Sequence, residues 1–487
     1  MNLRNSIALG GAIALTFFAG TASAFEDCPD GVTCTEYKGS GNGGYFRITV
    51  PQDWDGDLVI INHGFDLDKS SIRGHETCRQ SGTPVPCQQD SDCPTDIICN
   101  NISYFGLEEL LLPMGKAVAA STYSETGWAV FDSRKDLKEI LKFMKKHPDI
   151  GRPERTIVTG FSLGGAVTAD AILRTKIDGA LPLCGAVGGG LQTWDTANEV
   201  RLVYDFLCEG VEEGTFNSPP DVGEPTTFNS GNDAIGMAVV VNKCLGVPIG
   251  PSEDPVEAAA QADRLADFYE ITQFSGTNSE VAIAMGFATL GMGDFVRDAD
   301  RLGGKRIGWN ADPDLDYTTI GENPTLAAIY DAEVQRMTRG PGRGALAKST
   351  LIDFTKGKGK AVDYPILSMA GSADWLVIPE FQKVFTDAAE IGGKLLTQTW
   401  VGTYGHCTFT EEETAALFLE YFDWLDSADH VATQPTETDI AARCVSAEVG
   451  GIEGDTCNFD LGYAAAELHD RIPARPDWVP AAQPPTP

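Results

Sequence analysis

A serine flanked by glycines follows an apolar, β-branched run in the first half of the chain. Ser162 lies in Gly160-Phe161-Ser162-Leu163-Gly164, after the run 155–159 and before the small, apolar stretch 165–173. Strand, tight turn and helix in this order expose a serine hydroxyl, and the glycines let the backbone turn sharply. The start of a helix also favours developing negative charge. The pattern predicts Ser162 as a nucleophile.

A serine hydroxyl needs a general base, and the chain offers six histidines. His406 follows Gly405 in a loop directly after the predicted strand 395–400 and before the predicted helix 411–425. We predict His406 as the base. The other histidines precede the serine, end a helix or lie beyond the last predicted helix (His63, His75, His147, His430 and His469).

Asp374 is the predicted acid that orients the base. It lies in Gly371-Ser372-Ala373-Asp374, in the loop after the predicted strand 365–369. A loop after that strand can reach the loop of His406 after the next one. Three other carboxylates are less well placed, because none lies a few residues beyond the carboxyl end of a strand (Asp353, Asp363 and Glu380).

Two backbone N–H groups complete the predicted site as an oxyanion hole. One belongs to Leu163, the residue after the serine. The other comes from His63-Gly64-Phe65 at the end of the predicted strand 58–62, with Phe65 as the expected donor. His63 itself is expected to be structural.

Strand-like apolar runs alternate with helical patterns, which predicts βαβ units and a mostly parallel central sheet flanked by helices. The predicted strands are 58–62, 117–121, 155–159, 179–184, 365–369 and 395–400. The main predicted helices are 130–146, 165–173, 255–271, 326–337 and 411–425.

The strands fall in two pieces, which predicts one α/β core interrupted by a large insertion. We expect a signal peptide at 1–24, an N-terminal segment at 25–54, the first part of the core at 55–190 with a cysteine-rich insertion at 74–100, a mainly helical cap or lid domain at 191–362, the second part of the core at 363–428, and a C-terminal extension with a proline-rich tail at 429–487.

The chain is strongly acidic. Its 487 residues hold 36 Lys and Arg against 70 Asp and Glu, a formal net charge of −34. Such a surface repels phosphate backbones and anionic lipids, so no nucleic-acid partner is expected. One local exception is the basic stretch 336–360, with seven Lys and Arg and one Asp. A solvated linker is the favoured interpretation there, and an anionic-substrate site is the alternative.

The N-terminus and the cysteines indicate export. Arg4, an apolar stretch too short to span a bilayer and Ala22-Ser23-Ala24 follow the order of a secretory signal. We therefore expect a secreted, extracellular or periplasmic protein with no stable membrane insertion after cleavage. Most of the 12 cysteines should be bridged. They form local groups, with two left over: Cys28 and Cys34; Cys78, Cys87, Cys93 and Cys99; Cys208 and Cys244; Cys444 and Cys457; Cys184 and Cys407.

No cofactor and no metal are expected. Zinc is the competing interpretation of the cysteines, but no Cys-x-x-Cys pair exists and no cysteine group has a histidine at ligand spacing.

The motifs Asn62-His63-Gly64-Phe65, Gly160–Gly165, Gly371–Asp374 and Gly405-His406-Cys407 occur in the order and spacing of an α/β hydrolase. The chain resembles that superfamily and, within it, secreted bacterial esterases with a cap domain. The resemblance implies an α/β-hydrolase fold with a large, mainly helical cap insertion. It also implies Ser162 as nucleophile, His406 as base and Asp374 as acid.

The function expected from these features is a secreted serine hydrolase that cleaves carboxylic esters through an acyl-enzyme. Its substrate would be a small-molecule or polymeric ester, with polyesters and plant-derived esters as candidates. Two alternatives remain open. One is a secreted serine peptidase of prolyl-oligopeptidase type, which uses the same three residue types, and the other is a non-enzymatic binding protein on a hydrolase scaffold.

Tannases and feruloyl esterases, a related branch, bond a cysteine immediately before the nucleophile to a cysteine immediately after the histidine. In this sequence Cys407 follows His406, but Phe161 precedes Ser162, so that link cannot form. We expect Cys407 to pair with Cys184 or with another distant cysteine and so to steady the histidine loop.

Overall fold

The computed structural model describes residues 28–66, 102–216, 233–349, 364–446 and 457–478. They cluster in two compact units. The helical unit comprises Gln192–Ala345 and Leu468–Asp477, and the sheet unit comprises Ala22–Leu191, Leu346–Glu467 and the chain from Trp478 onward. The predicted signal peptide, the cysteine-rich insertion and residues 479–487 of the predicted tail lie outside the described residues.

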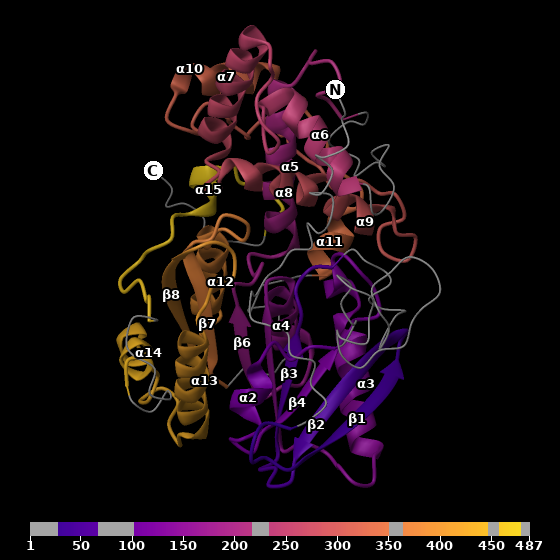
Figure 1. Cartoon of the computed structure of the whole chain (residues 1–487), viewed down its shortest axis with the longest axis vertical. Coiled ribbons are helices and arrows are strands. Elements are labelled where there is room, and N and C mark those ends of the chain that lie inside the picture. The colour runs from indigo at the N-terminus through magenta and orange to yellow at the C-terminus, as the bar shows by residue number, and fades with distance from the viewer. Residues whose placement is uncertain (1–27, 67–101, 217–232, 350–363, 447–456, 479–487) are drawn as a thin grey trace, which may run out of the picture. The chain divides into compact units, whose positions relative to one another are not determined.

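An eight-stranded sheet forms the sheet unit, with the order β1-β2-β4-β3-β5-β6-β7-β8 (Figure 1). β2 pairs antiparallel with β1 and β4, and all other neighbours are parallel. The strands are β1 (Cys34–Gly41), β2 (Gly44–Pro51), β3 (Asp57–Asn62), β4 (Ala117–Ser121), β5 (Arg155–Phe161), β6 (Gly179–Leu183), β7 (Ile366–Ala373) and β8 (Leu396–Tyr404).

The six strands predicted from apolar runs are all present. β3 and β6 are buried along their whole length, as parallel strands covered on both faces are. The N-terminal segment 25–54 differs from expectation because it holds β1 and β2. β1 is polar and at most half-buried at the sheet edge, so its sequence has no apolar alternation that would predict a strand. It is a strand because it pairs with β2.

Helices cover both faces of the sheet. On one face α2 (Leu107–Leu111) and α13 (Glu411–Asp426) share a buried core with alternate residues of the central strands. On the other face lie α3 (Ser133–Lys146), α4 (Leu163–Arg174) and α12 (Pro379–Ile391). The short η2 (Ala129–Phe131) precedes α3. Parallel strands with helices on both faces confirm the predicted fold class.

The helical unit has its own apolar core, which includes Tyr204, Phe268, Met285 and Tyr330. Its elements are α6 (Asp233–Leu245), α7 (Pro255–Thr272), α8 (Asn278–Gly286), η3 (Phe287–Gly291), α9 (Met292–Arg297), α10 (Pro324–Glu333), α15 (Leu468–Arg471) and all but the first two residues of α5 (Gly190–Leu207). The first three residues of α11 (Arg343–Ser349) belong to this unit and the rest to the sheet unit. α10 ends four residues before its predicted end, because Met337 is instead bonded to Asn310: its carbonyl accepts from the Asn310 N–H, and its own N–H donates to the Asn310 side-chain oxygen.

Residues 278–297 form the described stretch that is long and apolar enough to cross a membrane by length and composition. Just over half of this stretch is buried. Val281 and Met285 belong to the buried core of the helical unit, and Phe295 is completely buried. Core helices of soluble proteins pass the same test.

The C-terminal extension is more ordered than its sequence indicates. It contains α14 (Glu437–Cys444), and its residues 468–477 belong to the helical unit. Arg475 is buried there in an ion pair with Glu199. Asp477 accepts hydrogen bonds from Arg343, which also bonds both carboxylate oxygens of Asp195 at 2.7 and 2.8 Å. Such long-range pairing leaves no periodic signal in the sequence.

The same contacts correct the interpretation as a solvated linker for the first part of the basic stretch, and residues 350–360 of that stretch lie outside the described residues. Arg336 pairs with Asp331, Arg339 with Asp477, and Arg343 is completely buried. The three arginines are therefore held by carboxylates of the helical unit.

Charged side chains also tie the central strands together at their amino ends. Asp57 of β3 accepts two hydrogen bonds from Arg155 of β5, both at 2.6 Å, and one from Lys116 at 2.7 Å. Burial alone raises the pKa of Asp57, but the hydrogen bonds and charges of Arg155 and Lys116 bring it below its ordinary value.

We predict that Asp57→Asn lowers the free energy of unfolding by about 3 kcal/mol near neutral pH, because two cations lose a buried partner. The folded pKa lies below the unfolded one, so the stabilisation is complete above the ordinary value of 3.8 and is lost as the pH falls through the folded pKa. Urea unfolding of both proteins across this pH range measures the difference. Asp55→Asn, at the more exposed partner of Lys116, should cost less than about 1 kcal/mol. Equal costs for the two variants would contradict the prediction.

Candidate active site

Ser162 occupies a sharp turn between β5, which ends at Phe161, and α4, which begins at Leu163. Its backbone angles, φ 57° and ψ −118°, are rare for a residue with a side chain and cost about 1–3 kcal/mol. Hydrogen bonds hold this conformation. The Ser162 N–H donates to the carbonyl of Leu183 at 3.0 Å, and the Ala186 N–H donates to the carbonyl of Ser162 at 3.3 Å.

The glycines of the serine motif are required by the end of β3. A Cβ on Gly164 would lie 2.1 Å from the carbonyl oxygen of Asn62, and a Cβ on Gly160 would lie 2.6 Å from the same atom. Real Cβ atoms do not approach a backbone this closely, so any larger residue at either position pushes the turn away from β3. Both glycines are thus required because the end of β3, the end of β5 and the start of α4 pack backbone against backbone.

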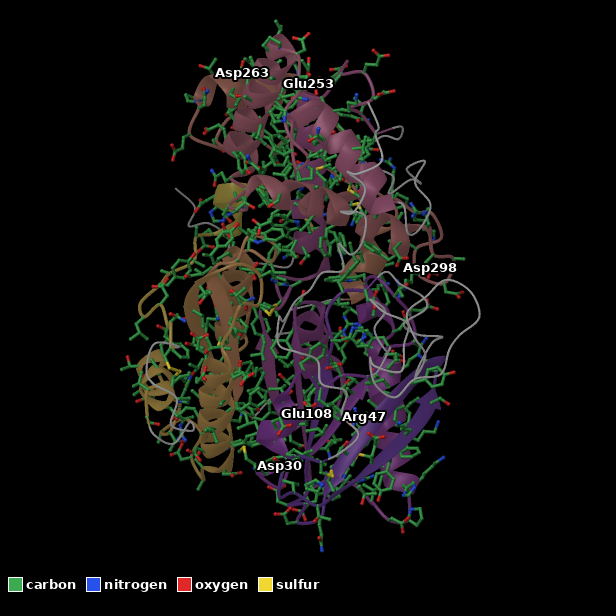
Figure 2. All side chains as sticks on the ribbon, viewed as in Figure 1. Asp30, Arg47, Glu108, Glu253, Asp263 and Asp298 are labelled. Atoms are coloured by element: carbon green, nitrogen blue, oxygen red, sulfur yellow. A yellow bond between two sulfur atoms is a disulfide. The ribbon has the colours of Figure 1, made fainter. Side chains whose placement is uncertain are left out.

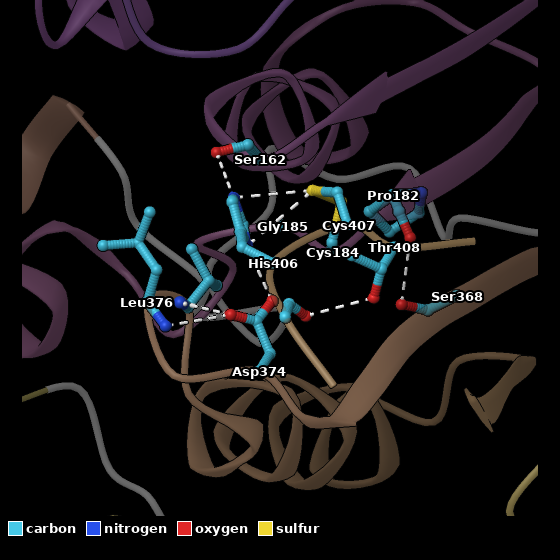
Figure 3. The surroundings of a disulfide bond; sticks show 12 residues. Ser162, Pro182, Cys184, Gly185, Ser368, Asp374, Leu376, His406, Cys407 and Thr408 are labelled. Atoms are coloured by element: carbon cyan, nitrogen blue, oxygen red, sulfur yellow. Dashed lines mark hydrogen bonds and ion pairs between the residues drawn. A yellow bond between two sulfur atoms is a disulfide. The ribbon is translucent and has the colours of Figure 1, made fainter. Parts of the chain in front are cut away.

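The structure brings the predicted Ser162, His406 and Asp374 together in one hydrogen-bonded chain (Figure 3). His406 Nε2 lies 2.8 Å from Ser162 Oγ, and His406 Nδ1 lies 2.6 Å from Asp374 Oδ2. His406 and Asp374 are buried, with 4% and 1% of their surface exposed. They meet because β7 and β8 are parallel neighbours, so the loops at their carboxyl ends share one edge of the sheet.

Backbone amides fix the Asp374 carboxylate. Its Oδ1 accepts hydrogen bonds from the N–H groups of Leu376 and Val377, both at 2.9 Å, which leaves Oδ2 for His406. A carboxylate only accepts hydrogen bonds, so Nδ1 is the ring nitrogen that carries a hydrogen. Nε2 then faces the Ser162 hydroxyl as an acceptor. The arrangement can withdraw a proton from Ser162.

The two segments that carry the predicted oxyanion donors both adjoin Ser162. Leu163 is the first residue of α4, where a backbone N–H has no acceptor within the helix. The loop after β3 lies beside the serine, since a Cβ on Gly64 would stand 3.6 Å from the Ser162 Cβ. Phe65 is the next residue of that loop and is half-buried.

A second loop braces the loop that holds Phe65, and Tyr123 after β4 is its main contact. The Tyr123 hydroxyl donates to the carbonyl of His63 at 2.8 Å, and the two rings pack at an angle of 30° with centroids 4.0 Å apart. The Gly127 N–H donates to the carbonyl of Asp66 at 2.7 Å. Both ends of the short loop 63–66 are therefore held, and the carbonyl and the ring of His63 both take part in this contact.

The bracing loop is itself anchored to buried polar groups. Asp136 accepts from the N–H and the hydroxyl of Ser124, both at 3.0 Å, and from the Asn42 side chain at 2.9 Å. Burial raises the pKa of the Tyr123 hydroxyl well above its ordinary value, so it stays protonated and donates its hydrogen bond. Tyr123 was not predicted from the sequence, although its place two residues after a predicted strand puts it at the same edge of the sheet.

Four disulfides lie within the described residues, and all eight of these cysteines are paired. Three join the members of local groups, Cys28–Cys34, Cys208–Cys244 and Cys444–Cys457. The fourth joins Cys184 to Cys407, the first of the two alternatives for Cys407. The group Cys78, Cys87, Cys93 and Cys99 lies outside the described residues. Four bonds indicate an oxidising environment.

Among the residues that the structure describes, no cluster of three His, Cys, Asp or Glu side chains has a geometry that could hold a metal ion. Of the less favoured acids, Glu380 belongs to α12, whereas Asp353 and Asp363 lie outside the described ranges.

The short contact between His406 and Asp374 has a spectroscopic consequence. A proton in a charge-assisted hydrogen bond of 2.6 Å is strongly deshielded, so we predict a proton NMR resonance far downfield of the backbone amides. Asp374→Asn should abolish it. Asp460→Asn is the control, because that carboxylate accepts from Ser372 Oγ at 2.7 Å instead, and this variant should keep the resonance. A downfield resonance that survives in Asp374→Asn would contradict the assignment.

No protein-family model matches the sequence, and a search of curated proteins finds no match. Solved structures with a similar backbone include an esterase from Aspergillus oryzae, with 12% identity over 81% of this chain and 79% of that chain and a TM-score of 0.41. A feruloyl esterase B from Aspergillus oryzae has 11% identity over 81% and 80% and a TM-score of 0.35. An acylaminoacyl peptidase from Pyrococcus horikoshii has 10% identity over 83% of this chain and a TM-score of 0.40, and the alignment spans 44% of its length.

The fold follows from the sheet itself. The strand order, the antiparallel β2 and the serine at the turn between β5 and α4 are together the features of the α/β-hydrolase fold. The sheet unit therefore has this fold.

Proposed function

We propose that the protein is a serine hydrolase that cleaves carboxylic esters through an acyl-enzyme on Ser162. The observation that carries the proposal is the chain of hydrogen bonds from Ser162 through His406 to Asp374. A hydroxyl, an imidazole and a buried carboxylate in this order are the components of nucleophilic acyl transfer.

In the proposed reaction Ser162 Oγ attacks the ester carbonyl while His406 Nε2 takes the hydroxyl proton. The tetrahedral oxyanion accepts hydrogen bonds from the N–H groups of Leu163 and Phe65. The C–O bond to the leaving alcohol then breaks, and the imidazolium returns its proton to that alcohol. Water attacks the acyl-enzyme with the same base, which releases the acid and frees Ser162. Asp374 holds the ring and stabilises its positive charge in each half-reaction.

Charge favours an uncharged ester, small or polymeric, including polyesters and plant-derived esters. The chain carries a formal net charge of −34, and acidic side chains such as Glu253 and Asp263 are exposed (Figure 2). The field of such a surface repels anionic substrates. Export fits the same proposal, because the described disulfides suit an oxidising compartment and the first 24 residues have the composition of a secretory signal.

We predict that Ser162→Ala lowers kcat for p-nitrophenyl esters by at least about 10⁴-fold, because the attacking atom is removed. The same variant should no longer be labelled by a fluorophosphonate probe. Ser427→Ala is the control, because this serine lies at the end of α13; the variant should keep both its esterase activity and its labelling by the probe. A wild-type protein that resists the probe would favour the binding protein, and strong cleavage of peptide anilides with negligible esterase activity would favour the peptidase.

We further predict that Tyr123→Phe lowers kcat about tenfold, with little change in KM. The variant frees the carbonyl of His63 and loosens the loop of Phe65, and this should cost less than losing an oxyanion donor outright, which costs about 10²–10³. Tyr204→Phe is a matched control, because that buried hydroxyl also donates to a backbone carbonyl, of Gly214 at 2.7 Å, but lies in the helical unit. Equal kcat losses in the two variants would show that Tyr123 acts only through stability.

A further inference from the structure

The disulfide Cys184–Cys407 joins two loops that the sheet alone does not connect. Cys184 follows β6 and Cys407 follows β8, and β7 lies between these strands. Both cysteines are buried, with 0% and 6% of their surface exposed. The bond therefore crosses the carboxyl end of β7 inside the candidate site (Figure 3).

The sulfur of this bond lies against the imidazole of His406. Cys407 Sγ is 3.4 Å from Nε2 and 3.7 Å from Nδ1 of the ring. His406 is thus fixed from two sides, by the carboxylate of Asp374 and by the disulfide. Cys407 is its direct neighbour in the chain, so a displacement of one moves the other.

The loop that carries Cys184 also holds the backbone of Ser162. Leu183 accepts the hydrogen bond of the Ser162 N–H, and Ala186 donates to the Ser162 carbonyl. The loop is itself fixed, because the Cys184 N–H donates to the carbonyl of Met369 at 2.8 Å and Gln382 Nε2 donates to the carbonyl of Gly185 at 2.8 Å. One rigid segment, Leu183–Ala186, is in this way bonded both to the serine and to the histidine loop.

Backbone conformation sets this disulfide apart from the others. Cys184 has φ 40° and Cys407 has φ 56°, in the left-handed region that residues with a side chain seldom adopt. None of the other six cysteines in described disulfides has a positive φ. Such conformations persist where the surroundings over-determine them, and they concentrate at functional sites.

We propose that the Leu183–Ala186 segment and the Cys184–Cys407 bond form a positioning device that sets the distance between Ser162 Oγ and His406 Nε2. This inference rests on the proposed function of Ser162 and His406 and deepens it. The cysteines take no part in the chemistry and act as positioning residues. The device also makes activity depend on oxidation of this bond, so that a chain with reduced Cys184 and Cys407 is folded but slow.

The direct test is the double variant Cys184→Ala/Cys407→Ala, assayed with an activated p-nitrophenyl ester. We expect kcat to fall about a hundredfold, because a displacement of a reacting group by about 1 Å has an effect of this size. KM should change by less than about threefold, since the pair does not bind substrate. The rate of labelling by a fluorophosphonate should fall by the same factor as kcat.

A second double variant, Cys208→Ala/Cys244→Ala, is the matched control. In the wild type, Cys208 and Cys244 are completely buried in the helical unit, and they are distant from Ser162 and His406 in the chain. The control variant should unfold at a lower temperature than wild type while kcat stays within about twofold. Cys444→Ala/Cys457→Ala repeats the control within the sheet unit. The proposal is overturned if the site variant keeps kcat within about threefold, or if a control variant loses as much.

If the site variant does not fold, the wild-type protein supplies the same comparison. A dithiol is added stepwise to the folded protein, where each reduction yields two cysteine thiols and one oxidised dithiol. Peptide mapping gives the reduced fraction of each disulfide at each step. Loss of kcat should follow the reduced fraction of Cys184–Cys407 and return on reoxidation, and activity that is unchanged while this bond is reduced overturns the proposal. A wild-type protein without esterase activity or probe labelling would refute the proposed function instead.

Discussion

The backbone of Ser162 is the constraint on which the site depends. Its left-handed φ is held by hydrogen bonds to Leu183 and Ala186, and the turn can form only because Gly160 and Gly164 admit the carbonyl of Asn62. Three chain segments, the end of β3, the start of α4 and the loop after β6, therefore meet without room for another side chain. Among the described residues, the groups that bond Ser162 come from these segments and from the loop of His406, which the Cys184–Cys407 disulfide ties to the loop after β6.

The two ends of the central strands have different roles. At the amino ends, the buried carboxylate of Asp57 in β3 pairs with Arg155 of β5 and with Lys116, the residue before β4. At the carboxyl ends, polar groups instead form hydrogen bonds between neighbouring loops, such as those of His406 with Asp374 and of Tyr123 with His63. The strained conformation of Ser162 persists because hydrogen bonds to Leu183 and Ala186 hold its backbone.

Buried charge also organises the helical unit. Arg343 and Arg475 are almost completely buried, and each is paired with carboxylates that come from distant parts of the chain. Removing one partner of such a pair leaves an uncompensated charge and is strongly destabilising. The C-terminal residues Arg475 and Asp477 are for this reason part of the folded helical unit, although their sequence is rich in proline and lacks periodicity.

The sequence by itself determined the six mutually parallel strands, β3 to β8, and the residues Ser162, Asp374 and His406 of the candidate site. It could do so because continuous apolar runs mark buried parallel strands, and because a nucleophile turn needs glycines at fixed positions. Only the tertiary structure decided the edge strand β1, the place of Arg475 and Asp477, the brace of Tyr123 and the pairing of Cys184 with Cys407. These features depend on contacts between residues far apart in the chain, and such contacts have no period or local composition that a single sequence displays.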